Sequence, residues 1–321
     1  MTTRIILNPF AGGGRARARV RQVRAVLQAG FGALDWTVSQ SPEHVTQLAA
    51  QAAAQGAERV VVCGGDGTVH FAAAGLVGTE TELAVLPVGT GNDVASALGI
   101  SSDTVTAAHQ LVGGATRRID AGEVNGRVFL CVLGVGMDTE ALGVVHRSPL
   151  RRGKFLYTWA ALRTLFTYEP RVVRITTEDM VYEGPVLFTA VTNTRTYAGG
   201  IPIAPSADIA DGKLDLCVIP DGGLSGALEA FAKAMGGNHV HMNGVVTAQP
   251  RQLRIESDEP LPITLDGELT SLTTDVTIRA LPGALKVRAA SPAARILHGD
   301  PRFARRQRRS VLEQFDRDPV G

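Results

Sequence analysis

The first hundred residues alternate short apolar segments with longer amphipathic ones. The strand-like segments are 4–7, 34–39, 59–63 and 83–87, and the helix-like segments that follow them are 15–29, 42–55, 68–77 and 92–98. This alternation predicts a parallel sheet with helices on its faces. The loops after parallel strands emerge at the carboxyl edge of such a sheet, where open α/β sheets bind ligands.

Polar or glycine-rich loops follow all four predicted strands. They contain Asn8 with Gly12, Gly13 and Gly14; Ser39; Gly64, Gly65, Asp66, Gly67 and Thr68; and Gly89, Thr90, Gly91, Asn92 and Asp93. Glycine backbone can lie close to a ligand, and the helix that begins at Thr68 offers free N–H groups and a positive dipole end to an anion. One such turn fits a plain strand-to-helix connection equally well, but four at one edge predict a phosphate site.

Neither of the two common nucleotide-binding sequence motifs is present. The loop at Gly12 lacks the Lys-Ser/Thr ending of a P-loop, and no strand ends in G-x-G-x-x-G with a later acidic residue. We therefore do not expect a P-loop NTPase or a dehydrogenase.

After about residue 120 the pattern changes to runs rich in β-branched residues. These runs are 127–135, 172–177, 186–192, 213–219, 244–248, 252–256, 261–265, 276–281 and 285–289, with helical patterns only at 151–167 and 224–235. They predict an antiparallel β-sandwich. We place a nucleotide-binding domain at 1–123, the sandwich at 124–290 and a polar, Arg-rich tail at 291–321, for which packing back on the first domain is one open arrangement.

Composition and charge narrow the classes of protein. With 321 residues, 45% of them hydrophobic, and a net charge of +1, the chain has enough apolar residues for two cores and no overall basic character to suggest a nucleic-acid partner. The cysteines at 63, 131 and 217 lie in apolar runs without metal-site spacing, which predicts buried, reduced thiols. No segment resembles a signal peptide or spans the about 20 apolar residues of a membrane helix. We expect a cytoplasmic protein that at most binds a membrane surface.

Two acids late in the chain are candidates for proton transfer. Asp266 and Glu268 stand two apart in a strand-like segment, so alternation predicts that they share a face. Their repulsion would then raise the pKa of one carboxyl and leave a group suited to accept a proton. The alternative is an exposed hairpin tip, because Asp-Gly is a common turn pair. For Asp93, capping a helix over 92–98 is an alternative to a catalytic role.

Together these motifs resemble one family. Asn8-Pro9 with Gly12, the 64–68 turn and the 89–93 loop are similar to the diacylglycerol kinase catalytic superfamily, which includes bacterial lipid kinases and is related to sphingosine and ceramide kinases and, distantly, to NAD kinases and phosphofructokinases. Gly199-Gly200, Ala204-Pro205, Asp211 to Asp215 and Leu265 to Glu268 extend the match to about residues 4–290. The sequence departs from the family at Ser96, where many relatives have Arg, and at Cys131, where they often have Asn.

The resemblance implies an ATP- and Mg²⁺-dependent lipid kinase that phosphorylates a hydroxyl of a diacylglycerol-like or sphingoid lipid. The residues implied to hold ATP are Asn8, Gly12, Gly13, Gly14, Ser39, Gly64, Gly65, Asp66, Gly67, Thr68, Gly89, Thr90, Asn92 and Asp93. Asp66 would organise Mg²⁺ and phosphates, with Glu268 and Asp266 as the base pair. Asp208, Asp211 and Asp215 with the carbonyl of Lys213 would hold a second, structural Mg²⁺, and a solvated acidic loop is the alternative.

Other features bear on partners. Arg15 and Arg19 lie one helical turn apart beside the presumed phosphates, and the arginines of the tail suit an anionic membrane. Apolar residues of the 151–167 helix, namely Phe155, Trp159, Leu162 and Phe166, would either shape a lipid cavity or form ordinary core. A kinase of NAD or another soluble metabolite and a non-catalytic lipid-binding regulator stay open as alternatives, as does a homodimer.

Overall fold

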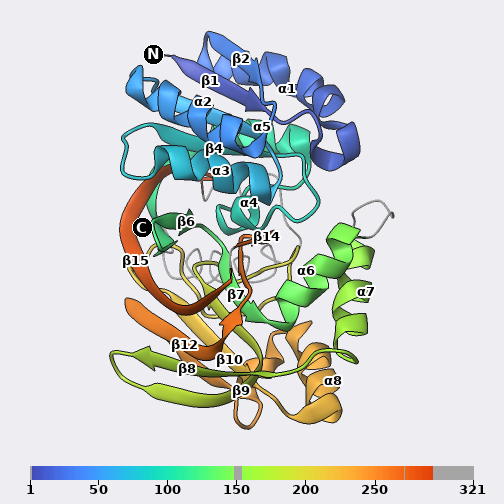
Figure 1. Cartoon of the computed structure of the whole chain (residues 1–321). Helices are drawn as coiled ribbons and strands as arrows, with labels where there is room; N and C mark the ends of the chain where they lie inside the picture. Colours follow the sequence, from blue (N-terminus) through green and yellow to red (C-terminus); the bar gives the residue numbers. More distant parts are fainter. Residues whose placement is uncertain (1, 148–153, 271, 292–321) are drawn as a thin grey trace, which may run out of the picture.

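The structure is a computed structural model that describes residues 2–147, 154–270 and 272–291. The Arg-rich tail from 292 onward and the first residues of the predicted 151–167 helix lie outside the described residues. Within the described part, the chain forms an α/β domain followed by an antiparallel β-sandwich, as the sequence predicts (Figure 1).

Four parallel strands form the sheet of the N-terminal domain. They are β1 (Thr3–Leu7), β2 (Leu34–Val38), β3 (Arg59–Gly64) and β4 (Glu82–Pro87), in the order β4-β3-β1-β2. Every residue of β3 and β4 is buried, which is typical of parallel strands covered on both faces. The connecting helices are α1 (Ala16–Phe31), α2 (Pro42–Ala54) and α3 (Asp66–Leu76), and α4 (Asp93–Ala97) and α5 (Thr104–Val112) follow β4. Thus α3 begins directly at Asp66.

The C-terminal domain is a set of antiparallel strands. These are β6 (Arg127–Phe129), β7 (Val132–Gly136), β8 (Arg171–Thr177), β9 (Val181–Thr192), β10 (Asp215–Pro220), β11 (Val246–Ala248), β12 (Gln252–Leu261), β13 (Ile263–Leu265) and β14 (Glu268–Leu269). Their inward-facing residues form a second core that includes Val191, Leu216 and Ile255. The alternation of buried and exposed residues along β8 and β12 matches an antiparallel sheet with one solvated face.

Two long strands join the domains. β5 (Ala115–Val124) and β15 (Thr273–Ala289) pair with each other, and β15 also pairs with β12 of the sandwich and, at Val287, with Leu83 of β4. In Figure 1, β15 is the orange ribbon that runs along one side from the sandwich to the first domain. The segments predicted as separate strands at 276–281 and 285–289 are therefore one strand, irregular between Leu281 and Leu285.

Three helices lie on the side of the sandwich opposite β15 in Figure 1. They are α6 (Met137–Arg147), α7 (Lys154–Thr164) and α8 (Gly223–Ala234). α6 and α7 form an antiparallel pair beside the junction of the two domains. β7 ends at Gly136, which has a φ of 113°, and α6 begins at the next residue. Because no loop separates the strand from the helix, the sequence shows no break between them.

Candidate active site

The glycine loops after β3 and β4 touch each other through their backbones. A Cβ built on Gly89 would lie only 2.4 Å from Cα of Gly65, and a Cβ on Gly64 would meet the side chain of Thr68 at 2.4 Å. A side chain at Gly89 would displace backbone, and one at Gly64 would displace the side chain of Thr68. The predicted turn is therefore a tight backbone corner shared by two neighbouring strands.

The carboxylate of Asp66 fastens this corner to the start of α4. Its Oδ2 accepts a hydrogen bond from the amide of Asn92 at 2.6 Å, and its Oδ1 accepts one from the amide of Val94 at 3.4 Å. Burial and the nearby charge of Asp93 raise the pKa of Asp66 to about 6, although these two amides oppose the shift. A buried carboxylate beside a second acid favours a cation between them.

Asp93 does not cap α4, so that alternative is wrong. Asn92 occupies the cap position with a φ of 60° and makes no side-chain cap. The carboxylate of Asp93 instead accepts hydrogen bonds from the hydroxyl of Thr196 at 3.0 Å and from the amide of Gly199 at 2.8 Å. Asp93 thus connects the first domain to the paired-glycine loop of the second.

The loop after β1 closes the other side of the site. The amide nitrogen of the Asn8 side chain donates to the hydroxyl of Thr68 at 2.9 Å, and the guanidinium of Arg15 donates to the carbonyl of Gly12 at 3.2 Å. Gly12 has a φ of 61°, and a Cβ there would lie 2.2 Å from the carbonyl oxygen of Val88. The loop therefore lies against the end of β4, as close packing at the carboxyl edge requires.

The carboxylate of Asp266 is bound by hydrogen bonds inside the protein, so the prediction that Asp266 and Glu268 share one face of a strand is wrong. Asp266 and Gly267 have φ values of 50° and 86°, so they form a turn between β13 and β14 rather than alternating along one strand. Amides of residues 130–132 donate to its carboxylate at 2.7–2.9 Å, and the Nδ1 of His70 on α3 lies 2.9 Å from its Oδ2. Burial would raise the pKa of Asp266, but His70 and these amides outweigh burial and lower it.

Glu268 stands apart from Asp266, at the start of β14. It is partly exposed, and its Oε1 lies 3.3 Å from where a Cβ of Gly67 would be. The carboxylate of the second domain is thus placed directly over the glycine turn of the first. The two acids of this turn have different surroundings: Asp266 is bound within the protein, and Glu268 faces the site.

One cavity of about 1460 Å³ connects these groups with a region of apolar side chains. Its polar end is lined by most of the predicted nucleotide-binding residues, by Arg15 and Arg19, and by Asp266 and Glu268. The predicted residues in the lining are Asn8, Gly12, Gly13, Ser39, Gly65, Asp66, Gly67, Thr68, Gly89, Thr90 and Asp93, whereas Gly14, Gly64 and Asn92 are not among the lining residues. Its apolar end lies among α6, α7, α8, β9 and β10. The apolar lining includes Met137, Leu142, Val145, Leu165, Phe188, Ile219, Phe231 and Met235.

The apolar wall comes from residues that the sequence did not single out. Ala161 and Leu165 represent the α7 region in the cavity, whereas Trp159, Leu162 and Phe166 are 43%, 40% and 62% exposed. The expectation that these three line a lipid cavity or form core is therefore wrong, because α7 turns a different face inward. The side chain of Phe155 lies outside the described residues. The three predicted cysteine thiols are free and buried, as expected.

Asp138 is a further acid of the cavity that the motif comparison missed. It sits in the first turn of α6, 7% exposed, and its Oδ2 accepts a hydrogen bond from the hydroxyl of Thr264 at 2.7 Å. Its Oδ1 is buried without a hydrogen-bond partner among the described residues. Burial raises the pKa of Asp138 to about 7. The sequence feature that could have identified Asp138 as a site residue is its position, just after a buried strand and in the first turn of a helix.

The acidic loop at 208–215 lies away from this cavity. Asp208 and Asp211 each accept a local amide, from Ala210 and Lys213, and Asp215 accepts from the side chain of Gln249 at 3.0 Å. Burial raises the pKa of Asp215 to about 6, and its Oδ2 has no hydrogen-bond partner among the described residues. Within the described ranges, no three His, Cys, Asp or Glu side chains are arranged to hold a metal ion.

Comparison with known proteins agrees with this architecture. Residues 2–124 match the family of the diacylglycerol kinase catalytic domain, and residues 131–289 match the YegS C-terminal NAD kinase beta sandwich-like domain. The chain is 30% identical over 292 residues to a diacylglycerol kinase of Mycobacterium tuberculosis, covering 88% of this chain and 93% of that protein. It is 29% identical over 270 residues to a diacylglycerol kinase of Bacillus subtilis, covering 83% and 89%.

Solved structures show the same fold. A crystal structure of a diacylglycerol kinase from Bacillus anthracis matches with a TM-score of 0.71 at 24% identity, covering 91% of this chain and 98% of that one. An NAD kinase from Archaeoglobus fulgidus, solved with ATP, matches with a TM-score of 0.51 at 12% identity, covering 92% and 97%. No helix in the described ranges has the length and apolarity needed to cross a membrane. By its sequence and its two matching domains, the chain belongs to the diacylglycerol kinase family of lipid kinases.

Proposed function

We propose that this kinase transfers the terminal phosphoryl group of ATP, with Mg²⁺, to a hydroxyl of a diacylglycerol-like or sphingoid lipid. The observation that carries the proposal is the single cavity with glycine loops and acids at one end and apolar side chains at the other. A soluble metabolite does not need the apolar end, and a lipid-binding regulator does not need the acids. The cavity has both the acids and the apolar end, as a kinase that binds ATP and a lipid at the same time requires.

The glycine loops would bind the phosphates of ATP. Backbone amides at the start of α3, together with Arg15 and Arg19 on the cavity wall, provide positive potential without bulk. Phosphoryl transfer depends mainly on fixing the phosphates in place and neutralising the charge that develops on them. The tight corner at Gly65 and Gly89 supplies the rigid part of that task.

The acids of the site fit a magnesium ion that is shared with the nucleotide. Mg²⁺ keeps several waters and is held by one or two carboxylates plus phosphates, so it does not need three protein ligands. The pKa of Asp66 is raised by burial and by the charge of Asp93, and a cation would relieve that repulsion. Asp66 would hold the ion, which when bound neutralises charge on the transferred group. We also propose a structural Mg²⁺ at the loop of Asp208, Asp211, Asp215 and the carbonyl of Lys213. Because these three carboxylates do not form a ready-made group of ligands, water would have to complete the coordination of the ion.

Glu268 is our candidate for the base that takes the proton from the lipid hydroxyl. It is the acid of the second domain that faces the glycine turn without a hydrogen bond to hold its carboxylate elsewhere among the described residues. Asp266, bonded to three amides and His70, sets the turn that presents Glu268. In this assignment Asp266 positions the base and does not react.

The test is phosphate transfer from radiolabelled ATP to diacylglycerol, phosphatidylglycerol, sphingosine and ceramide in mixed micelles, with NAD as a soluble control. We expect label in a lipid, dependence on Mg²⁺, and loss of at least about a hundredfold in kcat for Glu268→Gln. Glu259→Gln, which removes an exposed carboxylate of β12, is the matched control and should retain activity. Label in NAD alone would overturn the lipid assignment.

A further inference from the structure

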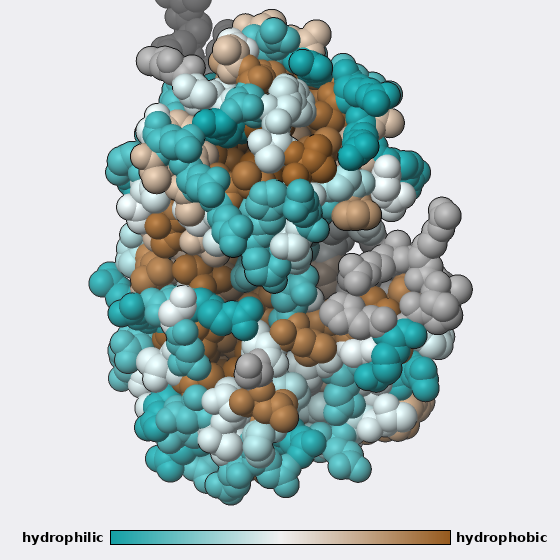
Figure 2. Space-filling view, turned by 45° about the horizontal axis from the view of Figure 1, so that its top comes forward, coloured by the Kyte–Doolittle hydropathy of each residue, from teal (hydrophilic) through white to brown (hydrophobic). Residues whose placement is uncertain are grey.

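On the side of the substrate cavity, hydrogen bonds of single side chains connect the two domains. Asp93 is bonded to the paired-glycine loop, and the ring of His70 on α3 is bonded to Asp266. Figure 2 shows hydrophobic patches beside hydrophilic residues along the middle of the molecule, where the domains meet. Domains with an interface of mixed polarity move relative to each other unless specific bonds restrain them. The bond of His70 reaches the turn that precedes the candidate base, Glu268.

The β13–β14 hairpin, which carries Glu268, lies at the end of the sheet. β13 pairs with β7 over residues 263–265, and β14 has only two residues and pairs with β13. In the sheet formed by the described residues, no strand lies beyond β14. Backbone pairing therefore holds one edge of the hairpin, and contacts outside the sheet must set the position of Glu268.

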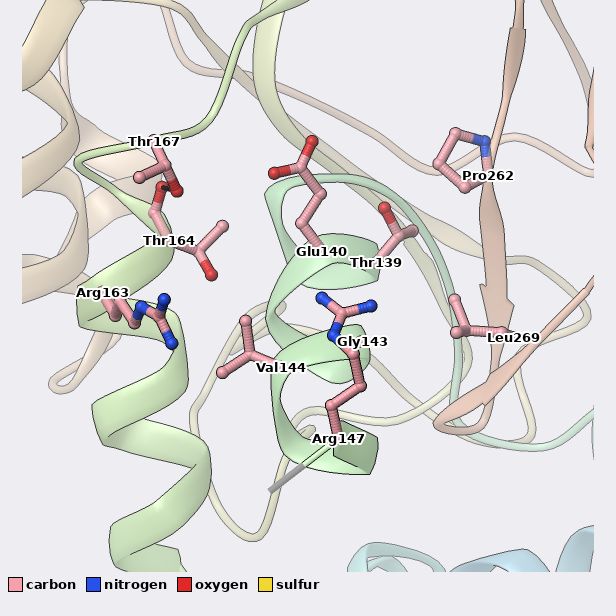
Figure 3. A pocket seen from close by; sticks show the side chains of 10 residues that line it. All are labelled: Thr139, Glu140, Gly143, Val144, Arg147, Arg163, Thr164, Thr167, Pro262 and Leu269. Carbon is pink, nitrogen blue, oxygen red and sulfur yellow. Dashed lines mark hydrogen bonds between the residues drawn. The ribbon is translucent and has the colours of Figure 1, made fainter. Parts of the chain in front are cut away.

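The hairpin also has open space on the side of α6. A second cavity, of about 450 Å³, lies between the hairpin and this helix, with Pro262 and Leu269 on one side and Thr139 and Gly143 on the other (Figure 3). Leu269, the second residue of β14, is 42% exposed. Close packing therefore does not fix the hairpin from this side, and its distance from the glycine turn depends on its contacts with α3.

His70 supplies the contact between α3 and the hairpin. It follows Asp66 by one helical turn, so both side chains lie on the same face of α3. The side chains of His70 and Asp266 are 5% and 1% exposed, and Nδ1 lies 2.9 Å from Oδ2. Burial raises the pKa of Asp266, but its bonds to His70 and to backbone amides outweigh burial and lower it. Because an ionised carboxylate has no proton to give, Nδ1 of His70 carries the hydrogen and donates it.

The other bonds of Asp266 stay within the second domain. The amides of residues 130–132, between β6 and β7, donate to its two oxygens at 2.7–2.9 Å. Without His70, the turn at Asp266 and Gly267 would therefore keep its place in the sandwich and lose its bond to α3. Glu268, whose Oε1 is 3.3 Å from the Cβ position of Gly67, would then be less firmly held over the glycine turn.

We propose that His70 is a positioning residue that acts through Asp266 to couple the nucleotide turn at 64–68 to the hairpin that carries the base Glu268. A nucleotide that orders the turn would then also order the hairpin. His70 does not line the substrate cavity, so it acts through another residue and does not touch the substrates. The inference rests on the proposed function for the role of Glu268, but the coupling itself is measurable with a nucleotide alone.

The first test is hydrogen–deuterium exchange of the full-length protein with and without Mg²⁺ and a non-hydrolysable ATP analogue, in the absence of lipid. We expect the analogue to slow exchange of the amides at 263–269 by about tenfold or more, the size expected for a hydrogen bond to a charged group. His70→Ala should still bind the analogue, yet lose this slowing. His70→Asn should keep it, because the side-chain nitrogen of Asn is as many bonds from Cα as Nδ1 and also donates.

The second test is the kinetics of phosphate transfer to a lipid. His70→Ala should lower kcat by at least about tenfold and change the KM for ATP by less than about threefold, since a misplaced reacting group costs rate more than binding. His70→Asn should restore most of the kcat. A fall in kcat that His70→Asn does not reverse would contradict the role of the donated hydrogen bond.

The matched control is His109→Ala, the same change at an exposed histidine of α5 that lines neither cavity, and it should behave like the unmodified protein. Thr196→Val removes a different bond across the junction, the one donated to Asp93, and should leave the response at 263–269 in place. Circular dichroism checks the fold of each variant. If His70→Ala does not fold, His70→Leu, which fills the buried site but cannot donate, takes its place.

The proposal is wrong if the analogue does not slow exchange at 263–269 in the unmodified protein, or slows it equally in the folded His70→Ala variant. It is also wrong if Thr196→Val abolishes the response as fully as His70→Ala, because general loosening of the domains would then explain both. Slowing that depends on His70 in a protein that phosphorylates no lipid would support the coupling and overturn the kinase assignment alone.

Discussion

At the scale of single residues, the site is a set of carboxylates that the fold treats differently. Asp66 and Asp138 are buried and hold their protons more tightly than usual, whereas Asp266 holds its proton less tightly because His70 and three amides stabilise its charge. The sequence located Asp66 and Asp266 from motifs, but not their surroundings. The partners of Asp266 are 130–132 and residue 70, more than a hundred positions away along the chain, so no local pattern reveals them.

Asp138 is expected to make stability depend on pH. A carboxyl whose pKa rises from 3.8 to about 7 on folding stabilises the protein fully below pH 3.8, and this contribution is lost as the pH rises toward 7. Asp138→Asn should flatten that part of the profile, by up to about 4 kcal/mol between pH 4 and 8. Urea unfolding at several pH values measures it. An unchanged slope in the variant would show that the buried carboxyl is not the source.

Asp266→Asn is expected to destabilise the protein by about 3–5 kcal/mol, because it removes a buried charge that accepts several hydrogen bonds. At temperatures where the variant is folded, kcat should fall while the KM for ATP and the pH profile change little, since the base is displaced rather than removed. His70→Asn, which keeps a donor beside Asp266, is the milder comparison. A shifted pH profile in Asp266→Asn would instead place Asp266 among the reacting groups.

At the scale of elements, hydrophobic periodicity predicts the helices and strands that are separated by clear loops. It does not predict where one element continues directly into the next. The first four strands and three helices have clear breaks between them, and their predicted ranges match the structure to within a few residues. The sequence predicts no element between residue 98 and the domain boundary at 123, where the structure has α5 and β5. It also does not predict α6, because β7 runs into this helix without a break. The sequence predicts two strands where β15 is one, because Pro282-Gly283 resembles a turn. In the structure these residues form an irregularity within the strand.

The loop after β1 offers a test of close packing at the nucleotide site. Gly12→Ala places a Cβ against the carbonyl of Val88, so the loop must move away from β4. We expect the KM for ATP to rise at least about tenfold, from conformational strain of about 1–2 kcal/mol plus the steric contact. Gly13→Ala is the matched control: its φ is 69°, yet no atom lies within 4 Å of its Cβ. Equal increases of the KM in the two variants would mean that backbone strain alone, and not contact with the carbonyl of Val88, explains the effect of Gly12→Ala.

At the scale of the whole molecule, the two domains share a spine. β15 pairs with β12 in the sandwich and with β5 and β4 at the first domain, and the carboxylate of Asp120 accepts the amides of Gly212 and Gly283 at 2.6 and 2.7 Å. Asp120 thereby ties the bend of β15 to the acidic loop of the second domain. We therefore propose that the two domains, which meet near residue 124, unfold together as one unit.

The two tryptophans of the chain test this coupling, since Trp36 lies on β2 and Trp159 on α7. Single-tryptophan variants Trp159→Phe and Trp36→Phe should report the same urea midpoint, because the spine makes unfolding cooperative. Adding Asp120→Ala leaves two amides without their acceptor, which costs about 1–3 kcal/mol for each. We expect the two midpoints then to separate. Separate midpoints already in the single-tryptophan proteins would contradict coupling through the spine.

The pairing of Val287 with Leu83 also has a consequence for synthesis on the ribosome. β4 emerges early, but β15, which hydrogen-bonds to its edge, is made only after the whole of the sandwich strands β6 to β14. Until residue 287 is available, the nascent first domain exposes an unpaired apolar edge, which is a template for aggregation. A stalled or prematurely ended chain that lacks β15 is thus the form of this protein most in need of a chaperone.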